Sequence, residues 1–229
     1  MTSARIEMLT PTEAAVVSCV AVRDVNRVID EKILPKGLYK VGRDRTRWFD
    51  VDACAFISFY FKAANQLTSE ERMRTIVAAS AGLQGEVAGV LEKEWIIRRE
   101  FLTIDLAPFL RSVHQRLAKL TAAHALVVED ADILGGTPVI RDTRIPVYDI
   151  AASVTAGLPT QRILAAYPGL TADNLELAAL YAEANPQRGR PRRSPTLPTG
   201  SVVISTEWRQ ARDRTADGQS RVGQDHRSL

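Results

Sequence analysis

The 229-residue chain has little of what builds metal sites and disulfide frameworks: three histidines and two cysteines. His114, His124 and His226 lie far apart and have no cysteine partners at the spacing of a metal site. Cys19 and Cys54 each sit in an apolar run, so we expect two free thiols in a reducing compartment rather than a disulfide. The sequence therefore predicts neither a metal nor a cofactor.

Long apolar stretches and catalytic signatures are also missing. No apolar run reaches the ~18 residues that a membrane-spanning helix needs, and the N-terminal residues lack the apolar core of a secretory signal. The chain contains no HExxH, no GxSxG, no glycine-rich loop followed by Lys-Ser/Thr, and no evident Ser/His/Asp set. We therefore expect a cytoplasmic protein that is not an enzyme and has no contact with membranes.

What the chain does have is apolar content and an uneven distribution of charge. Apolar residues make up 45% of the sequence, which is enough for hydrophobic cores. The net charge of +3 divides into +2 for residues 1–50, −4 for residues 51–185 and +5 for residues 186–229. Because the basicity belongs to the C-terminal tail, a nucleic-acid surface on the folded body must be a local patch.

The N-terminal residues carry the signals of two helices separated by a tight turn. Thr10, Pro11 and Glu13 form a helix start, with an N-cap, a proline in the first turn and a capping-box partner. After a turn at residues 18–20, apolar residues recur at three- and four-residue spacing in AVRDVNRVIDEKI, which predicts a second helix. Two strand-like runs on either side of GRDR, residues 42–45, then predict a hairpin.

Further helices and one strand are expected up to residue 122. Asp52 is predicted to cap the apolar helix ACAFISFYFKAAN, and LTSEERMRTIVAAS and APFLRSVHQRLAKL are predicted to form two more helices. The segment EWIIRREFLTIDL is expected to be a strand. We place a module boundary between Leu120 and Ala125, so that residues 1–122 form the first domain.

This order of elements is typical of a DNA-binding domain. Ala14 and Ala15 supply small residues where the second helix crosses the first, and Val25 and Val28 supply its apolar anchors. The other face of that helix and the basic hairpin are predicted to contact DNA through Arg23, Asn26, Arg27, Lys40, Arg43, Arg45 and Arg47. The first three would read bases and the other four would contact phosphates. The alternative is a helical hairpin whose exposed face is merely charged.

The arrangement resembles the winged helix-turn-helix of MerR-like and excisionase-like regulators. In those regulators glycine often fills the turn position that Cys19 occupies here, and a left-handed backbone is less comfortable for cysteine. The expected fold is mainly α-helical with short β-hairpins. It comprises this N-terminal domain, a small helix-turn-helix-like module at residues 123–185 and a flexible tail at residues 186–229.

The second module opens with GGTPVIRDTRIPVYDI, Gly135 to Ile150. LVV, PVI and IPV are predicted short strands, with a bend at residues 141–144 where Asp142 is expected to bond backbone donors. Helices are predicted at residues 148–156, with Gly157 at its end, at residues 161–166, and after a cap at Thr171. We favour a structural hairpin over a phosphate loop, which would have more glycines and a helix N-terminus directly behind it.

With the later motifs AGL, IL, YPGLT and AALYA, this stretch resembles the bacterial family known as domain of unknown function 433 over residues 126–185. Asp142 stands where that family usually has glycine, and Pro159 where a capping serine is common. The resemblance implies a small module of type II antitoxins, and the whole chain resembles a larger VapB-type antitoxin. The partners so implied are a PIN-domain ribonuclease toxin and operator double-stranded DNA. We also expect a homodimer, because operator sites are usually two-fold symmetric.

The tail, residues 186–229, combines many prolines and arginines with one apolar island, SVVISTEW. The predicted toxin-binding residues are Val202, Val203, Ile204, Trp208, Arg209 and Arg212, with Arg190, Arg192 and Arg193 as a second choice of arginine. The alternative function is a stand-alone transcriptional regulator whose basic tail only adds DNA affinity. The apolar island speaks against it, because phosphate contacts need no such residues.

Overall fold

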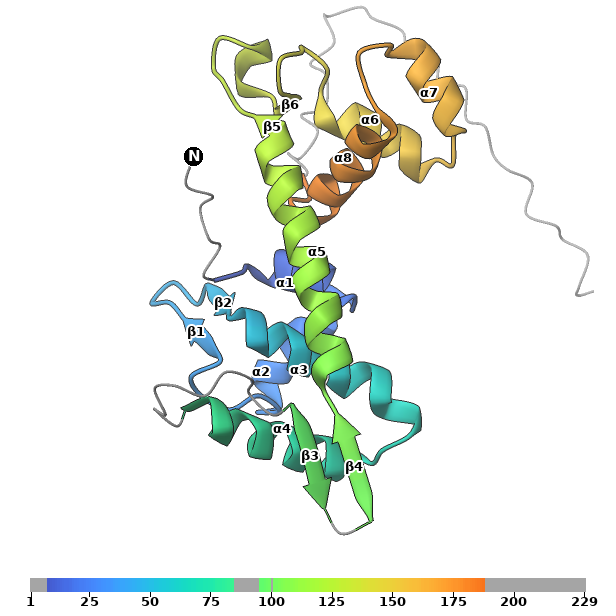
Figure 1. Cartoon of the computed structure of the whole chain (residues 1–229). Helices are drawn as coiled ribbons and strands as arrows, with labels where there is room; N and C mark the ends of the chain where they lie inside the picture. Colours follow the sequence, from blue (N-terminus) through green and yellow to red (C-terminus); the bar gives the residue numbers. More distant parts are fainter. Residues whose placement is uncertain (1–7, 85–94, 100, 188–229) are drawn as a thin grey trace, which may run out of the picture. The chain divides into compact units, whose positions relative to one another are not determined.

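The computed structural model describes residues 8–84, 95–99 and 101–187 (Figure 1). These residues are mainly helical and contain three two-stranded antiparallel sheets. The chain divides into two units, residues 1–188 and 189–229, and the second unit lies outside the described residues. Within the described ranges, no helix is both long enough and apolar enough to cross a membrane.

Helix α1 (Pro11–Ser18) begins at the predicted capping box. The Thr10 hydroxyl accepts a hydrogen bond from the Glu13 backbone N–H at 3.3 Å, and the Glu13 carboxylate accepts one from the Thr10 backbone N–H at 2.8 Å. The same carboxylate lies 3.1 Å from Nε2 of His124, 111 residues further along the chain. Burial raises the pKa of Glu13, but the hydrogen bonds from His124 and Thr10 outweigh it and hold that pKa below its ordinary value.

The turn after α1 depends on a cysteine in the left-handed region. Cys19 has φ 58° and ψ 50°. The backbone N–H of Val20 donates to the Ala15 carbonyl at 3.1 Å and that of Cys19 to the Val16 carbonyl at 3.3 Å, which are the two bonds of a Schellman motif. Cys19, which stands where the resembling regulators often have glycine, therefore adopts a backbone conformation that glycine accommodates more easily.

Helix α2 (Val22–Asp30) packs through Val25 and Val28, both fully buried. Strands β1 (Tyr39–Val41) and β2 (Arg47–Phe49) then form the predicted hairpin, in which Lys40 lies opposite Trp48. The backbones of Leu9 and Phe49 exchange two hydrogen bonds of 2.8 Å. The segment before α1 thus continues this small sheet and fixes the hairpin to the N-terminal helices.

Helix α3 (Val51–Lys62) is the centre of the first core, with every residue from Ala53 to Tyr60 buried. Its cap is Asp50 rather than the predicted Asp52: the Asp50 carboxylate accepts a 2.6 Å bond from the Asp52 backbone N–H. The helix starts one residue before Asp52, which therefore lies in its first turn. Helix α4 (Ser69–Gln84) begins at the predicted start signal, where Thr68 and Glu71 form a reciprocal capping box.

The segment predicted as a single strand is a hairpin of β3 (Ile96–Arg99) and β4 (Leu102–Asp105). Ile97 and Ile104 lie opposite each other on its inner face, where Ile104 is buried and Ile97 packs against the first core. Glu100 and Phe101, which separate the two strands in the sequence, are not among the residues that usually mark a turn. For that reason the sequence reads as one continuous strand.

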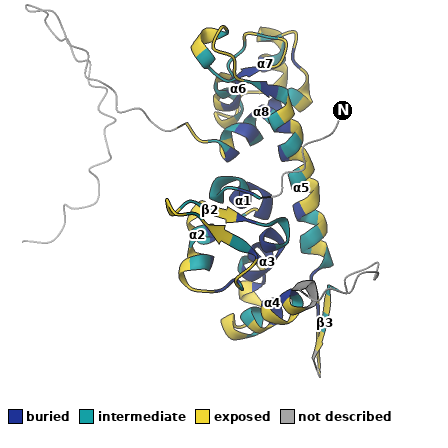
Figure 2. Ribbon diagram, turned by 90° about the vertical axis from the view of Figure 1, so that its left-hand side faces the viewer, coloured by how far each residue is buried: buried dark blue, intermediate teal, exposed yellow. Residues whose placement is uncertain are grey.

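Helix α5 (Ala107–Leu126) runs without interruption through the predicted module boundary (Figure 1). Leu120 belongs to the core built around α1 and α3, and Ala123 belongs to a second core built around α6 and α8. Buried residues accordingly follow one face of the helix in both modules (Figure 2). The two modules therefore share one helix, which continues past its predicted end at Leu120.

The second module largely follows its sequence signals. LVV and PVI pair as strands, whereas IPV contributes only the isolated bridge between Pro146 and Val139. Gly157 has a positive φ of 73° directly after the first predicted helix, and Thr171 forms a capping box with Asn174. The elements are β5 (Val127–Val128), β6 (Val139–Ile140), α6 (Val147–Thr155), α7 (Thr160–Ala166) and α8 (Ala172–Ala184). The described residues also form short 3-10 turns at Ala63–Asn65 and Leu134–Gly136.

The bend after β6 is closed by Thr143, not by the predicted Asp142. The Thr143 hydroxyl donates to the Ile140 carbonyl at 2.7 Å and accepts from the Ile145 backbone N–H at 3.1 Å. Asp142 has a φ of 60°, so it occupies the left-handed position at which the related family has glycine. Arg141 donates through Nε to the Ala125 carbonyl at 2.8 Å, which ties the bend to the end of α5.

We predict that Cys19→Gly stabilises the protein by about 0.5–1 kcal/mol. The left-handed conformation costs an L-residue about 1–2 kcal/mol, part of which glycine loses again through its freedom in the unfolded chain. Urea unfolding measures the change. Asp142→Gly should act in the same direction, and Ala165→Gly, at an exposed helical position, should destabilise by about 1 kcal/mol. A loss of stability in Cys19→Gly would contradict the left-handed turn.

Candidate nucleic-acid interface

Helix α2 and the β1–β2 hairpin, here called the wing, are joined by the side chain of Arg47. One guanidinium nitrogen lies 3.0 Å from the Asn26 carbonyl and 3.1 Å from its side-chain oxygen, and the other lies 2.6 Å from the Asp30 carboxylate. The Arg47 side chain is only 25% exposed. Arg47 therefore fixes the angle between the wing and α2 and faces the protein, not solvent.

The other three predicted phosphate contacts project freely from the wing. Lys40, Arg43 and Arg45 are exposed, and none of their side chains has a hydrogen-bond or ion-pair partner within the described residues. Lys40 lies on the outer face of β1, and Arg43 and Arg45 lie in the turn between the strands. These three charges are available to an external anion.

The turn of the wing is stabilised by its own hydrogen bonds, which do not involve these basic side chains. The Asp44 carboxylate accepts hydrogen bonds from the backbone and the hydroxyl of Thr46, and these bonds hold the pKa of Asp44 below its ordinary value. The Gly42 N–H donates to the Thr46 carbonyl at 2.7 Å, and Arg45 adopts a left-handed φ of 65°. A Cβ on Gly42 would come within 2.6 Å of the Asp44 carboxylate, so any larger residue there would displace that side chain.

The three predicted base-reading residues differ in how far they are engaged. Arg23 has a side chain 88% exposed, at the N-terminal end of α2. Arg27 is half exposed and donates through Nε to Glu31 at 2.6 Å along the helix. Asn26 donates to the Val22 carbonyl at 3.1 Å and accepts from Arg47. Arg23, whose Nε lies 3.8 Å from the Asp24 carboxylate, therefore has the weakest internal contact of the three.

Positive charge outweighs negative charge on this face because α2 and the wing carry Arg23, Arg27, Lys40, Arg43, Arg45 and Arg47 against Asp24, Asp30, Glu31 and Asp44. Asp30 pairs with Arg47, Glu31 pairs with Arg27, and Asp44 accepts bonds from Thr46. An exposed pair such as Arg27–Glu31 adds little to helix stability, so Arg27 can exchange it for a better partner at little cost.

Trp48 is a surface residue that the sequence reading missed. It is 37% exposed and lies directly opposite Lys40 on the outer face of the wing. Its neighbour Phe49 is fully buried. Because side chains alternate along a strand, the burial of Phe49 places Trp48 outward, and that alternation was the available signal. The predicted tail contacts, from Val202 to Arg212, lie outside the described residues.

The fold thus combines a helix–turn–helix–hairpin arrangement with a second helical module on the same long helix. Residues 127–182 of that second module match the family described as Protein of unknown function (DUF433). Over 212 residues, 91% of this chain and 95% of the other, the sequence is 51% identical to the "Uncharacterized protein y4eO" of Sinorhizobium fredii (strain NBRC 101917 / NGR234). The chain therefore belongs to the same protein family as y4eO. No solved structure matches it.

We predict that Arg47→Lys loosens the wing although the charge is kept. Lysine cannot reproduce the forked contact with Asp30 and Asn26, and the loss of such a partly exposed contact costs about 1 kcal/mol. Hydrogen exchange of the amides in residues 39–41 and 47–49 should accelerate about fivefold, as that free energy implies. Arg45→Lys is the matched control and should leave exchange unchanged. Equal exchange in both variants would show that Arg47 does not hold the wing.

Proposed function

We propose that this protein is the antitoxin of a type II toxin–antitoxin pair. It binds operator DNA through a winged helix-turn-helix formed by α1, α2 and the wing, and so represses its own operon. It neutralises a PIN-domain ribonuclease through residues 186–229. The observation that supports DNA binding best is the wing latched to α2 by Arg47, with Arg23 and the basic wing side chains left open to solvent.

The geometry suits base readout by α2 and phosphate contacts by the wing. An α-helix fits the major groove of B-DNA, where arginine reads guanine and asparagine reads adenine through paired hydrogen bonds worth about 1–3 kcal/mol each. That exceeds the strength of the Arg27–Glu31 pair, so Arg27 would leave Glu31 for a guanine edge. Lys40, Arg43 and Arg45 would meet phosphates beside the groove. The second module has no comparable basic hairpin, which favours the N-terminal one as the DNA reader.

We predict different losses from the two sets of residues. Arg27→Ala should weaken binding to the operator by about 1–3 kcal/mol and change binding to random DNA little. Arg45→Ala should weaken both alike and reduce the salt dependence by about one unit of slope, because one phosphate contact is lost. Fluorescence anisotropy on both DNAs over a salt series measures these effects. Equal losses on both DNAs for Arg27→Ala would assign α2 a role other than base readout.

The toxin-binding part of the proposal is supported by the composition of the tail and by the VapB-type resemblance. A PIN-type nuclease holds a divalent metal between clustered carboxylates, and an inserted arginine could pair with those acids and displace the metal. Val202, Val203, Ile204 and Trp208 would dock on apolar surface nearby, with Arg209 or Arg212 entering the acidic site. An apolar strand followed by a tryptophan is suited to sheet-edge addition with an aromatic anchor.

We predict that deletion of residues 186–229 abolishes neutralisation of the nuclease and leaves operator binding largely intact. Within the full chain, Trp208→Ala should weaken toxin binding by about 2 kcal/mol or more if Trp208 is the anchor. Co-purification from native expression and an RNA-cleavage assay measure both effects. A truncated protein that still silences the nuclease would move the inhibitor to the second module. A clean preparation without any ribonuclease would favour the stand-alone regulator.

A further inference from the structure

The outer face of the wing carries an exposed tryptophan, Trp48, which is 37% exposed. Within the described residues its indole N–H has no hydrogen-bond acceptor, and its ring takes part in no ring pair and no cation–π contact. Trp95, in contrast, packs its ring against that of Phe56, with centroids 5.7 Å apart. A single exposed apolar residue is ordinary, but Trp48 presents a hydrogen-bond donor as well as apolar surface.

The wing holds Trp48 in a fixed position. Its neighbour on one side, Phe49, is fully buried, and its neighbour on the other, Arg47, is bonded to α2. Its backbone lies opposite that of Lys40 in the strand pair. Because the fold already sets the position of the ring, a partner that contacts it does not have to order this segment first, which favours binding.

Positive charge lies beside the ring. Lys40 is its cross-strand neighbour on the same face, and Arg43 and Arg45 lie in the turn between the two strands. Cross-strand partners place their Cβ atoms about 4.5–5.5 Å apart, so one partner molecule can contact both Trp48 and Lys40. Asp44, the acidic residue of the turn, accepts hydrogen bonds from Thr46. This face therefore suits an anionic partner that also presents apolar surface.

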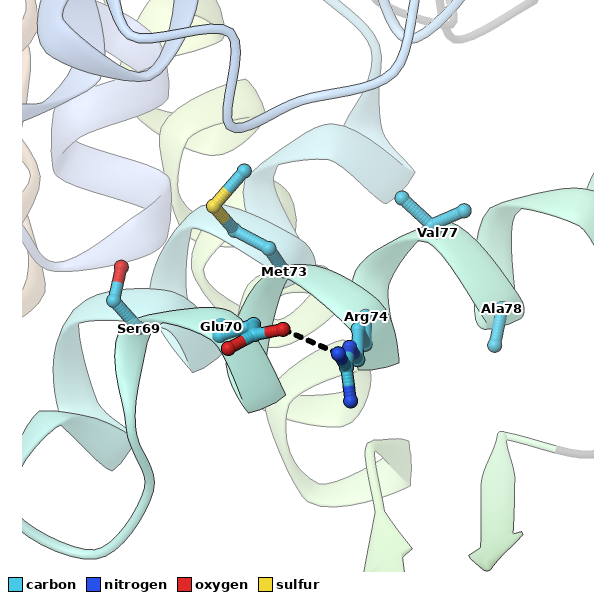
Figure 3. Close-up of a pocket in the computed structure, with 6 residues that line it drawn as sticks. All are labelled: Ser69, Glu70, Met73, Arg74, Val77 and Ala78. Carbon is cyan, nitrogen blue, oxygen red and sulfur yellow. Dashed lines mark hydrogen bonds and ion pairs between the residues drawn. The ribbon is translucent and has the colours of Figure 1, made fainter.

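The exposed apolar surface on α4 has a different charge pattern. Val77 is 57% exposed there and lines a shallow pocket (Figure 3). The two charged residues that line the same pocket, Glu70 and Arg74, form an ion pair with each other. Their charges cancel, so this surface offers an anion nothing comparable to the basic side chains of the wing.

We infer that the outer face of the wing packs against the sugar–phosphate backbone of double-stranded DNA, with Trp48 as the apolar contact. The indole ring covers a deoxyribose, its N–H donates to a phosphate oxygen, and Lys40 neutralises a phosphate. A DNA strand alternates charged phosphates with uncharged sugars, so one strand matches both side chains. The inference rests on the proposed DNA-binding function and adds to it a contact that is neither ionic nor specific for sequence.

The salt dependence of binding separates the ring from the charge beside it. In the full chain, Trp48→Ala should weaken binding to operator and random duplex alike, by about tenfold, as expected for the loss of a tryptophan anchor. It should leave the slope of log affinity against log salt unchanged, because no counterion-releasing contact is lost. Lys40→Ala should also weaken both duplexes but reduce that slope by about one unit. Fluorescence anisotropy over a salt series measures both.

Two further variants control for altered folding and for the general loss of apolar surface. Trp48→Phe keeps an aromatic ring at the same place and should restore most of the affinity that Trp48→Ala loses. Val77→Ala removes exposed apolar surface from α4 and should change neither the affinity nor the salt slope. A flatter salt slope in Trp48→Ala, or an equal loss in Val77→Ala, would overturn the inference.

A direct measurement of the contact keeps Trp48 itself. In a chain with Trp95→Phe and Trp208→Phe, Trp48 is the one remaining tryptophan. Saturation with random-sequence duplex DNA should lower the quenching of its fluorescence by acrylamide, because the DNA backbone covers the ring. Unchanged quenching in the saturated complex would show that the ring stays in solvent and would refute the contact.

The remaining outcomes distinguish this inference from the proposed function. If Trp48→Ala binds both duplexes as wild type does but no longer neutralises the nuclease, the outer face of the wing contacts the toxin and the inference is wrong. A larger loss on single-stranded than on duplex DNA would mean that the ring stacks on bases, which also overturns it. Both results leave the DNA-binding role of α2 standing. A wild-type chain that binds no duplex DNA would refute that role together with this inference.

Discussion

Helix α5 is the constraint on which the rest of the described structure depends, because one uninterrupted helix supplies residues to both hydrophobic cores. It packs through Val113 and Leu120 on the core around α3, and through Ala123 near its end on the core around α6 and α8. Arg116 donates to the Val16 carbonyl of α1 at 3.2 Å. A helix resists bending because every turn repeats the same hydrogen bonds, so the two modules are joined without a flexible link.

The wing connects the first core to the candidate nucleic-acid interface. Phe49 anchors β2 in the first core, Leu9 pairs with its backbone, and Arg47 turns inward to α2 while its neighbour Trp48 turns outward. The alternation along three consecutive residues therefore decides which side chains stabilise the wing and which remain open to a partner. A basic residue on a predicted DNA-binding hairpin is not by that fact a phosphate contact. Arg47 has the right charge, but its two nearest acceptors belong to the protein.

The sequence predicts this fold best where the determining interaction is local. The caps at Thr10 and Thr171, the turn at Cys19 and the glycine at position 157 each depend on residues within one helical turn, and the structure confirms them. Contacts between distant residues could not be predicted. Asn26 and Arg47 are 21 residues apart, and Glu13 and His124 are 111 apart. The β3–β4 turn was missed for a different reason, since Glu100-Phe101 lacks the usual turn residues. Helix α5 runs past its predicted end at Leu120 because a change of core leaves the helical pattern unchanged.

The junction of the two modules is polar as well as apolar, and this makes their arrangement specific. His124 on α5 contacts the Glu13 carboxylate of α1 and packs edge-on against Tyr181 of α8, with ring centres 5.5 Å apart. The Tyr181 hydroxyl in turn donates to Glu129 at 3.1 Å, and burial is the largest cause of its raised pKa. Apolar contacts alone tolerate small rotations, whereas a chain of directed hydrogen bonds has one geometry in which all of its members are satisfied.

Because Ala184 at the end of α8 is buried in the first core, the last described helix ends against the N-terminal module. The end of α8 is therefore held by both cores.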